Sequence, residues 1–425
     1  MALTRVRVKI DGTWITLAYN SATGRYEGYY TPTRTSFHQP GGYFNVEAEA
    51  SNSSGLTAEA DGSVFDGLRL PVRETTAPGL TLVSPPQGYV TVKRPAIVMD
   101  AVDEPDGSGI DPGSFLVVMD GAAQTAGKST AAIAGGYRLT WRPAANWSEG
   151  RHLVTFSISD HDGNQVSASA AYTTDTEPPS LWVTLPGWNR VVDVASAYIR
   201  AQAFDLTSGP AVVSASNNGK TISMKPAEPE AGEFYDVYDA LVPLEVGENN
   251  ITITARDGAG WTTKQSIYMI RLITDRVQAD VDRLTRMFAR GGIDTWTDEE
   301  LEWFNMELLR GSYDAEDLTR VRLAVAYLAQ VLMQYFGFNP HISGQGGWET
   351  EDVPVRTDMA AYLADVATIR DAQGLAELSD LLLPETIRFL NFVGANQIEE
   401  ALVFTDDFFD RYSWWSSGEI SSGEA

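Results

Sequence analysis

The sequence predicts a multidomain protein in which three all-β sandwich domains are followed by one all-α domain. Three observations carry this prediction: a repeat of roughly one hundred residues, a strict apolar–polar alternation inside it, and a change of period near residue 274. The chain has 425 residues, which suits three or four domains of ordinary size. Hydrophobic residues make up 43% of it, so every domain can bury a core.

The repeat is a segment that opens with glycine and closes with an Asx-x-x-Gly turn. Its copies begin at Gly42, Gly150 and Gly247, with spacings of 108 and 97 residues, the size of one small sandwich domain. Inside each copy apolar residues alternate with polar ones, as in a strand with one buried face. The Asx side chain can accept backbone N–H groups and the glycine supplies a positive φ, so each copy predicts a hairpin.

Proline-containing junctions recur between the repeats and set the domain boundaries. Pro78 and Pro178 each precede a short strand that ends at a second proline, Pro85 or Pro186. Proline stiffens a linker and removes a hydrogen-bond donor at a strand edge. The predicted domains are 1–74, 75–175 and 176–272, followed by a helical domain at 273–425.

After residue 274 the apolar period becomes 3.6 residues, which indicates helices. No heptad persists, so a compact helical domain is favoured over a coiled coil. The signals are an apolar stripe at Val277, Val281, Leu284 and Phe288, a capping box at 297–300, starts at Tyr313, Thr357 and Pro384, and a short sixth helix around Ile398, Leu402 and Val403.

Charge and composition exclude several classes of partner and chemistry. The net charge is −26, and from residue 275 onward 28 Asp and Glu face 11 Arg and no Lys. Such a chain repels nucleic acid and anionic membranes, so neither is expected as a partner. The acidic helical domain is either a solvated surface or a docking face for a basic partner. The absence of cysteine excludes disulfides, thiolate metal sites and Cys nucleophiles.

The sequence shows neither a signal peptide nor a membrane span. Its start alternates like a strand and lacks an apolar signal core. The longest apolar stretch, at 323–338, is interrupted by Gln330 and Gln334 and predicts a core helix.

No motif for catalysis is found, so the chain is expected not to be an enzyme. HExxH and GxSxG are absent, and the four histidines share no metal-ligand spacing. The segment GAAQTAGKS at 121–129 resembles a phosphate-binding loop, but it has five residues between its glycines where four are needed. Glu299, Glu300, Glu302 and Glu307 could supply paired carboxylates for glycoside cleavage, or simply a solvated helix face.

Two acidic loops suit Ca²⁺, the one cofactor considered. The first contains Asp103 and Asp106, and the second contains Asp160 and Asp162. Carboxylate oxygens at alternate positions are the hard ligands that Ca²⁺ prefers. Neither loop matches a complete EF-hand, and Asx-rich turns also occur without metal, so that reading stays open.

Aromatic residues provide the remaining candidate sites. Tyr26, Tyr29 and Tyr30 cluster in a predicted hairpin, where they either stack on a ligand such as a glycan or belong to the core. Trp414, Trp415 and Ile420 lie in the C-terminal tail, where they either anchor in a neighbouring subunit or fold back onto the helices.

The junctions and the DHDGN turn at 160–164 resemble the tandem bacterial immunoglobulin-like (Ig-like) domains of surface proteins. The whole layout, with WTDEELEW at 296–303, LRGSYDAEDL at 309–318 and the ending SGEISSGEA, resembles Ig-like virion proteins of bacteriophages. This resemblance implies three immunoglobulin-like sandwiches and a non-enzymatic tail, fibre or surface protein. It carries over no catalytic residue.

We therefore expect a virion structural or adhesion protein, assembled in the host cytoplasm. Tandem Ig-like modules are usually displayed outside cells, and release of particles by lysis reconciles that with the missing signal peptide. The expected partners are other virion proteins, the chain itself in a homo-oligomer, and host-surface glycan. The alternatives are a bacterial surface adhesin, a component of a contractile injection system, and a glycan-active enzyme with Ig-like spacers.

Overall fold

A computed structural model describes residues 3–187, 190–305, 310–343, 348, 355–372, 382–387 and 390–417. The chain divides into two compact units, Met1–Glu177 and Pro178–Ala425. The first unit consists of β-sheets and one short 3-10 turn, whereas the second combines sheets with the five α-helices of the described residues.

The first 74 residues form one main antiparallel sheet and two short strand pairs. The sheet order is β2-β1-β6-β7, and the pairs are β3 with β4 and β5 with β8. The core of this region is small, with Ile10, Phe44 and Val46 buried. Its assignment as a further Ig-like sandwich stays a prediction. The strand bounds are β1 Leu3–Ile10, β2 Thr13–Thr16, β3 Ala18–Asn20, β4 Arg25–Glu27, β5 Phe44–Asn45, β6 Glu47–Asn52, β7 Thr57–Ala60 and β8 Arg69–Leu70.

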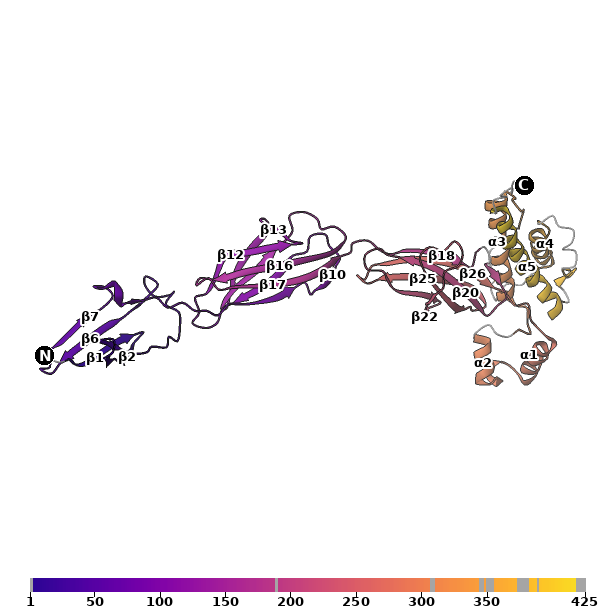
Figure 1. Ribbon diagram of the computed structural model, residues 1–425. Helices are drawn as coiled ribbons and strands as arrows, with labels where there is room; N and C mark the ends of the chain where they lie inside the picture. The colour runs from indigo at the N-terminus through magenta and orange to yellow at the C-terminus, as the bar shows by residue number, and fades with distance from the viewer. Residues whose placement is uncertain are drawn as a thin grey trace, which may run out of the picture. The chain divides into compact units, whose positions relative to one another are not determined.

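Residues 79–174 form a complete two-sheet sandwich (Figure 1). A five-stranded sheet of order β10-β17-β16-β12-β13 faces a four-stranded sheet of order β14-β15-β11-β9. Trp141, Phe156 and Tyr172 are the largest fully buried side chains of its core. The strand bounds are β9 Gly79–Ser84, β10 Gly88–Val90, β11 Ile97–Val102, β12 Ile110–Met119, β13 Ala122–Gln124, β14 Lys128–Ile133, β15 Gly136–Trp141, β16 Gly150–Asp160 and β17 Gln165–Thr174.

The strands between residues 180 and 271 repeat this layout. A four-stranded sheet of order β18-β20-β24-β23 faces a five-stranded sheet of order β19-β26-β25-β21-β22. In both sandwiches a short edge strand joins the five-stranded sheet in parallel, β10 on β17 and β19 on β26. The strand bounds are β18 Ser180–Leu185, β19 Val191–Val192, β20 Ser196–Phe204, β21 Pro210–Asn217, β22 Lys220–Ser223, β23 Lys225–Ala227, β24 Asp236–Pro243, β25 Gly247–Asp257 and β26 Thr262–Arg271.

The predicted alternation is found in the repeated strands. Along β16 the side chains of His152, Val154, Phe156, Ile158 and Asp160 are buried, and the residues between them are more exposed. β25 shows the same pattern. The sequence period thus identified which face of each strand meets the opposite sheet.

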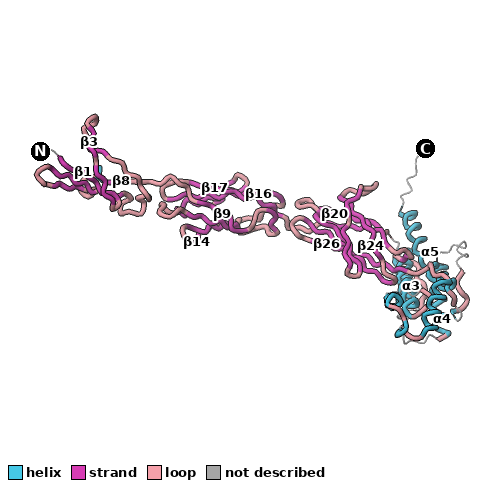
Figure 2. The backbone as a smooth tube through the Cα atoms, turned by 90° about the horizontal axis from the view of Figure 1, so that it is seen from below, coloured by secondary structure: helices cyan, strands magenta, loops and turns pink. Residues whose placement is uncertain are grey.

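The helices pack directly against the sandwich at 180–271. One core joins Val191, Ile270 and Leu272 of the strands and their connections to residues of α3, α4 and α5. Figure 2 shows these three helices gathered at one end of this sandwich. No helix in the described part of the chain is long and apolar enough to span a bilayer. The helix bounds are α1 Gln278–Arg290, α2 Asp298–Asn305, α3 Ala315–Phe336, α4 Arg356–Asp371 and α5 Phe392–Ser417.

Local capping signals located two helix starts correctly. Thr297 and Glu300 exchange side-chain-to-backbone hydrogen bonds of 2.9 and 3.2 Å as a capping box at α2. Asp314 caps α3, accepting from the backbone N–H of Glu316 and Asp317.

The helix predicted to start at Pro384 is wrong, because the described residues 382–387 contain no α-helix, and only Ile387 among them belongs to a 3-10 turn. The helix begins after Asn391, whose side chain accepts from Gly394 N at 2.9 Å. The predicted short sixth helix is therefore the interior of α5, which spans 26 residues.

Candidate functional site

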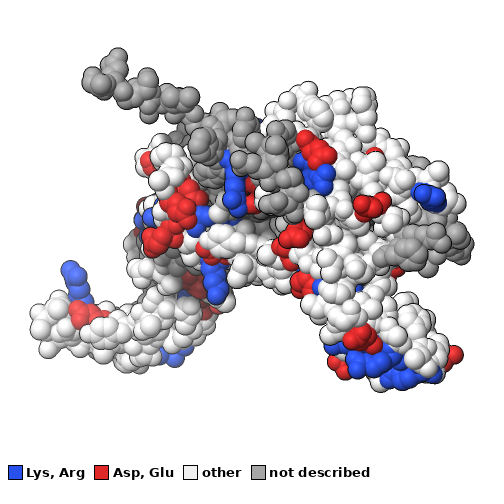
Figure 3. All heavy atoms as spheres, turned by 90° about the vertical axis from the view of Figure 1, so that its right-hand side faces the viewer, with Lys and Arg blue, Asp and Glu red and all other residues white. Residues whose placement is uncertain are grey.

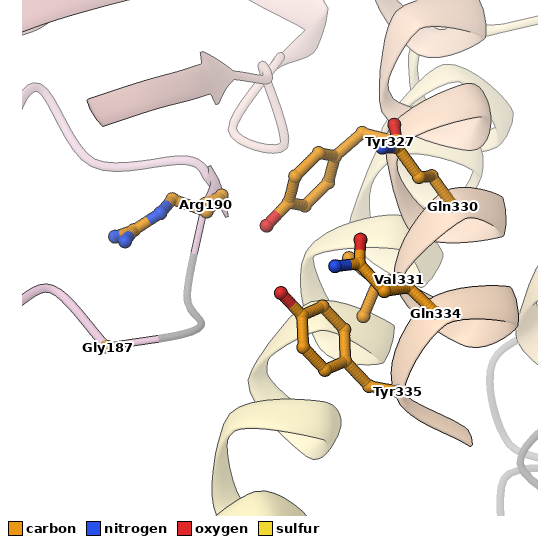
Figure 4. Close-up of a pocket in the computed structure, with 7 residues that line it drawn as sticks. All are labelled: Gly187, Arg190, Tyr327, Gln330, Val331, Gln334 and Tyr335. Carbon is orange, nitrogen blue, oxygen red and sulfur yellow. The ribbon is translucent and has the colours of Figure 1, made fainter. Parts of the chain in front are cut away.

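The junction between the sandwich at 180–271 and the helical domain contains an open hollow of about 350 Å³ (Figure 4). It lies between the segment before β19 and the exposed face of α3. The hydroxyl groups of Tyr327 and Tyr335 point toward it, whereas the Arg190 guanidinium points away from the helix. Arg190 Nη1 donates to the Pro186 carbonyl oxygen at 2.7 Å. The lining residues are Gly187, Arg190, Tyr327, Gln330, Val331, Gln334 and Tyr335.

The hollow offers hydrogen bonding and no catalytic chemistry. Its described lining supplies phenol hydroxyls, amides and one arginine, but no carboxylate, histidine or hydroxyl nucleophile paired with a base. A nucleophile and a base within hydrogen-bond reach are the minimum for covalent or acid–base catalysis. The groups at this hollow are therefore hydrogen-bonding groups at the joint between the sandwich and the helices.

Asp406 of α5 holds the start of β19 at this joint. Its Oδ2 accepts from the backbone N–H of Arg190 at 2.5 Å and of Val191 at 2.6 Å. The side chain is buried, and its Oδ1 has no hydrogen-bond partner in the described structure. Burial raises the pKa of Asp406 to about 7, although the two backbone hydrogen bonds oppose the rise. The Asp406 side chain on α5 thus accepts the backbone N–H groups that a neighbouring strand would otherwise bind at the start of β19.

A second anchor is a buried cluster of two arginines and two acids. Arg276 Nη2 lies 2.7 Å from both Asp317 Oδ1 and Glu399 Oε1. Arg320 pairs with the same two acids, at 2.9 Å from Glu399 Oε1. All four side chains are at most 8% exposed, and their charges balance.

The cluster also holds the chain that leaves β26. Glu399 Oε2 accepts from Ile273 N, and Arg276 Nη1 donates to the Ile273 carbonyl oxygen, both at 2.6 Å. Buried charges remain stable only when they are paired and hydrogen-bonded in this way. The connection from sandwich to helices is therefore fixed by α3 and α5 together.

The first acidic loop lies at the junction between the N-terminal region and the sandwich at 79–174. Carboxylate oxygens of Glu74, Asp103 and Glu104 lie within 4.8 Å of one another. Asp106 is exposed, has a φ of 65° and is outside this group. The sequence pointed to Asp103 but missed Glu104, although it follows directly, and Glu74, which only folding brings near.

Burial, together with the neighbouring Glu104 carboxyl, raises the pKa of Glu74. The Glu74 carboxyl is partly desolvated, and the Glu104 carboxyl beside it carries the same charge, so both effects disfavour the ionised form of Glu74. The opposing hydrogen bond from Ser108 N to Glu74 Oε1 does not cancel the rise.

In the second acidic loop the fold itself occupies most carboxylate oxygens. Asp160 Oδ1 accepts from Gly163 N at 2.6 Å and Asn164 N at 2.8 Å, as in an Asx turn. Asp162 Oδ2 accepts from Thr35 Oγ1 at 2.6 Å and from Glu74 N at 3.0 Å. Asp160 thus forms a turn, and Asp162 contacts the N-terminal region. Neither role needs a metal ion.

The tyrosine cluster separates into different environments. Tyr26 packs on Tyr19 with ring centroids 5.3 Å apart. Tyr30 contributes to the small N-terminal core, whereas Tyr29 is fully exposed and alone keeps the character of a free ligand-stacking residue. In the tail, the side chains of Trp414 and Trp415 and the whole of Ile420 lie outside the described residues.

An exposed aromatic platform lies on the sandwich at 180–271. Trp182 and Tyr235 stack with an interplanar angle of 11° and centroids 5.1 Å apart, and Phe204 lies 4.8 Å from Tyr235. Their exposed fractions are 44%, 39% and 38%. Trp182 lies in β18, Phe204 in β20 and Tyr235 just before β24, so no local sequence pattern connects the three rings.

Comparison with known proteins shows resemblance in fold. No protein-family model and no curated protein sequence matches the chain. The fibronectin(III)-like modules of Clostridium thermocellum CbhA share 16% identity, covering 45% of this chain and 94% of theirs, with a TM-score of 0.30. An I-band fragment of titin shares 14%, covering 63% and 87%, at 0.31. The Sidekick-1 immunoglobulin domains 1–5 share 14%, covering 63% and 51%, at 0.25.

Proposed function

We propose that this chain is a non-enzymatic structural or adhesion component of a bacteriophage virion, placed in a tail, fibre or surface decoration. Its three Ig-like regions act as spacers or weak binders of host-surface glycan. Its helical domain docks to other virion proteins or to further copies of the chain. The proposal rests on the architecture and on the sequence resemblance described above.

The observation that carries the proposal is the joint between the last sandwich and the helices. A shared core, the Asp406 contact to β19 and the buried cluster around Glu399 join the two domains. A docking domain must hold its spacer in one direction to present it at a symmetric position on a particle. An enzyme with Ig-like spacers would need instead a convergent site of nucleophile, base and cavity, and the hollow at this joint does not supply one.

The distribution of charge supports docking through a mixed surface. On the face shown in Figure 3, Lys and Arg lie close to Asp and Glu, with broad uncharged areas between them.

The aromatic platform of Trp182, Phe204 and Tyr235 supports the weak glycan binding in this proposal. Flat exposed rings stack on the apolar faces of sugars, and aromatic contacts add about 0.5–1.5 kcal/mol each. Such a site would bind weakly on its own and gain strength through several copies on one particle.

The test is electron microscopy of particles released from the producing cells, with an antibody against residues 275–425. Label at regular symmetric positions supports a structural role and locates the chain. Absence of label, together with absence of the chain from the mass spectrum of purified particles, would refute it and favour a cell-surface adhesin. Cell-wall zymography addresses the enzyme alternative, and clearing there would contradict the non-enzymatic part of the proposal.

A further inference from the structure

We propose that Glu74, Asp103 and Glu104 form a Ca²⁺ site at the junction between the N-terminal region and the sandwich that follows. The three carboxylates come from the linker and from the loop between β11 and β12. Their oxygens lie within 4.8 Å of one another, a separation that one hard cation can bridge. The site is independent of virion assembly.

The first argument is that three formal negative charges meet here without a basic partner. The described ion pairs among residues 3–187 use other acids, such as Asp100 with Arg138 and Glu149 with Lys93. Backbone N–H groups satisfy only one oxygen each of two acids: Ser108 N donates to Glu74 Oε1, and Gly109 N donates to Asp103 Oδ2. Uncompensated like charges this close are unfavourable unless a proton or a cation is shared between them.

The second argument is independent of the clustering and concerns two buried oxygens. Glu74 Oε2 and Asp103 Oδ1 are buried and accept no hydrogen bond in the described structure. Asp103 as a residue is only 8% exposed. A buried carboxylate oxygen without a partner costs a few kcal/mol, and a coordinated cation removes that cost. Asp103 therefore contributes an unused buried oxygen at this cluster.

The backbone next to the carboxylates is shaped to leave them room. A Cβ added to Gly107 would lie 2.6 Å from Asp103 Oδ2 and 2.9 Å from Glu74 Oε2. A larger residue here would therefore force one or both carboxylates to shift. The Gly107 carbonyl oxygen also accepts a hydrogen bond from His38 Nε2 at 3.1 Å. This bond ties the loop to the N-terminal region.

The chemistry favours Ca²⁺ over Mg²⁺. Ca²⁺ accepts six to eight oxygens in irregular geometry and completes its shell with water, whereas Mg²⁺ demands a near-ideal octahedron and dehydrates reluctantly. Here two of the three acids, Glu74 and Asp103, are already oriented by backbone hydrogen bonds, and Glu74 N also donates to Asp162 Oδ2 at 3.0 Å. A rigid and irregular set of carboxylates of this kind suits the larger ion.

Binding would tie the linker to the loop at 103–109 and so stiffen the junction within the first unit. Glu74 already contacts both loops at this end of the sandwich, since its carbonyl oxygen accepts from Asn164 Nδ2 at 3.2 Å. A cation bound by Glu74, Asp103 and Glu104 would add a direct coordination link between the linker and the β11–β12 loop. Ca²⁺ thus becomes a regulator of how freely the N-terminal region moves.

The experiment is calorimetric titration of the full chain, first stripped with chelator, with CaCl₂ and with MgCl₂ at pH 7.5. We expect one Ca²⁺ per chain with Kd on the order of 10⁻⁴ M, in the range of extracellular modules, and Mg²⁺ binding at least about tenfold weaker. Hydrogen exchange of residues 73–76 and 103–109 should slow when Ca²⁺ is added.

Variants make the test specific. Glu104→Gln and Asp103→Asn should each weaken Ca²⁺ binding by about tenfold or more. Glu104→Gln is the safer variant because no hydrogen bond of the described fold uses its side chain, apart from its contact with Glu74. Asp106→Asn is the matched control: it removes one charge from the same loop, outside the cluster, and should leave the affinity unchanged.

Several results would overturn the proposal. One is the absence of saturable binding up to about 10 mM CaCl₂, a concentration above the weakest known modules, which would leave a shared proton as the explanation of the cluster. Another is equal affinity in wild type and Glu104→Gln. A third is a loss of affinity in Asp106→Asn as large as in Glu104→Gln, which would indicate general attraction to an acidic loop. None of these results bears on whether the chain is found in particles.

Discussion

Replacing Asp406 with asparagine should remove a pH dependence from the stability of the helical domain. Asp406 is buried in α5, and its pKa is raised to about 7 from 3.8 because burial disfavours the charged form. The folded protein therefore binds this proton more tightly than the unfolded chain does. The stability from this group is fully present below about pH 4 and is lost as the pH rises through about 7.

The magnitude follows from the size of the shift. A rise of about three pKa units corresponds to about 4 kcal/mol across the whole window, at 1.36 kcal/mol per unit. About 2.5 kcal/mol of that loss falls between pH 5 and pH 8. Asparagine has nearly the same shape, keeps an oxygen for the N–H groups of Arg190 and Val191, and does not titrate. The stability of Asp406→Asn relative to wild type should therefore rise by about 2.5 kcal/mol from pH 5 to pH 8.

The assay is urea unfolding followed by circular dichroism at 222 nm. In the described part of the chain the α-helices all lie after Val277, so this signal reports the helical domain rather than the sheets. Measuring both proteins at both pH values cancels every other titrating group, since only the difference between them is used. The fit is made on the helical transition alone because a chain of several domains does not unfold in one step.

Asp407→Asn is the matched control, since the neighbouring Asp407 is partly exposed and pairs with Arg411 at 2.6 Å. Its stability difference from wild type should stay constant with pH to within about 0.5 kcal/mol. A constant difference for Asp406→Asn would refute the reasoning, because it would mean that Asp406 is ionised at both pH values.

Three further predictions follow from burial and exposure. Glu399→Gln leaves two buried arginines short of one negative charge and should lower the free energy of unfolding of the helical domain by about 3–5 kcal/mol. The exposed Glu400→Gln should change it by under about 0.5 kcal/mol, and urea unfolding at 222 nm measures both variants. Trp141→Ala empties the core of the sandwich at 79–174 and should cost that domain about 3–5 kcal/mol in calorimetry, and a cost under about 1 kcal/mol would contradict the assignment of its core. Trp182→Ala should weaken binding to a host-surface glycan array about three- to tenfold, while Trp14→Ala, similarly exposed on the N-terminal sheet, should not; equal effects of the two variants would argue against the platform.

Features set by neighbours in the chain could be predicted well. The buried face of β16 and the caps of α2 and α3 depend on residues two to four positions apart, and they were found where the sequence pattern placed them. The wrong helix start at Pro384 also came from a short-range signal in the sequence. Proline favours a helix start but does not require one, and the cap at Asn391 decided where α5 begins.

The sequence by itself determined the strand periods, the point where sheets give way to helices, and the absence of cysteine chemistry. Only the tertiary structure decided which charged groups meet. Asp406 reaches Arg190 across 216 residues, Glu399 reaches Arg276 across 123, and Glu74 meets Asp103 and Glu104 only at a domain junction. Each acidic side chain looks like a solvated one in the sequence, because local patterns record periodicity and capping but not which distant surface will bury it. Contacts of that kind are settled by packing, where burial makes an unpaired charge too costly to leave alone.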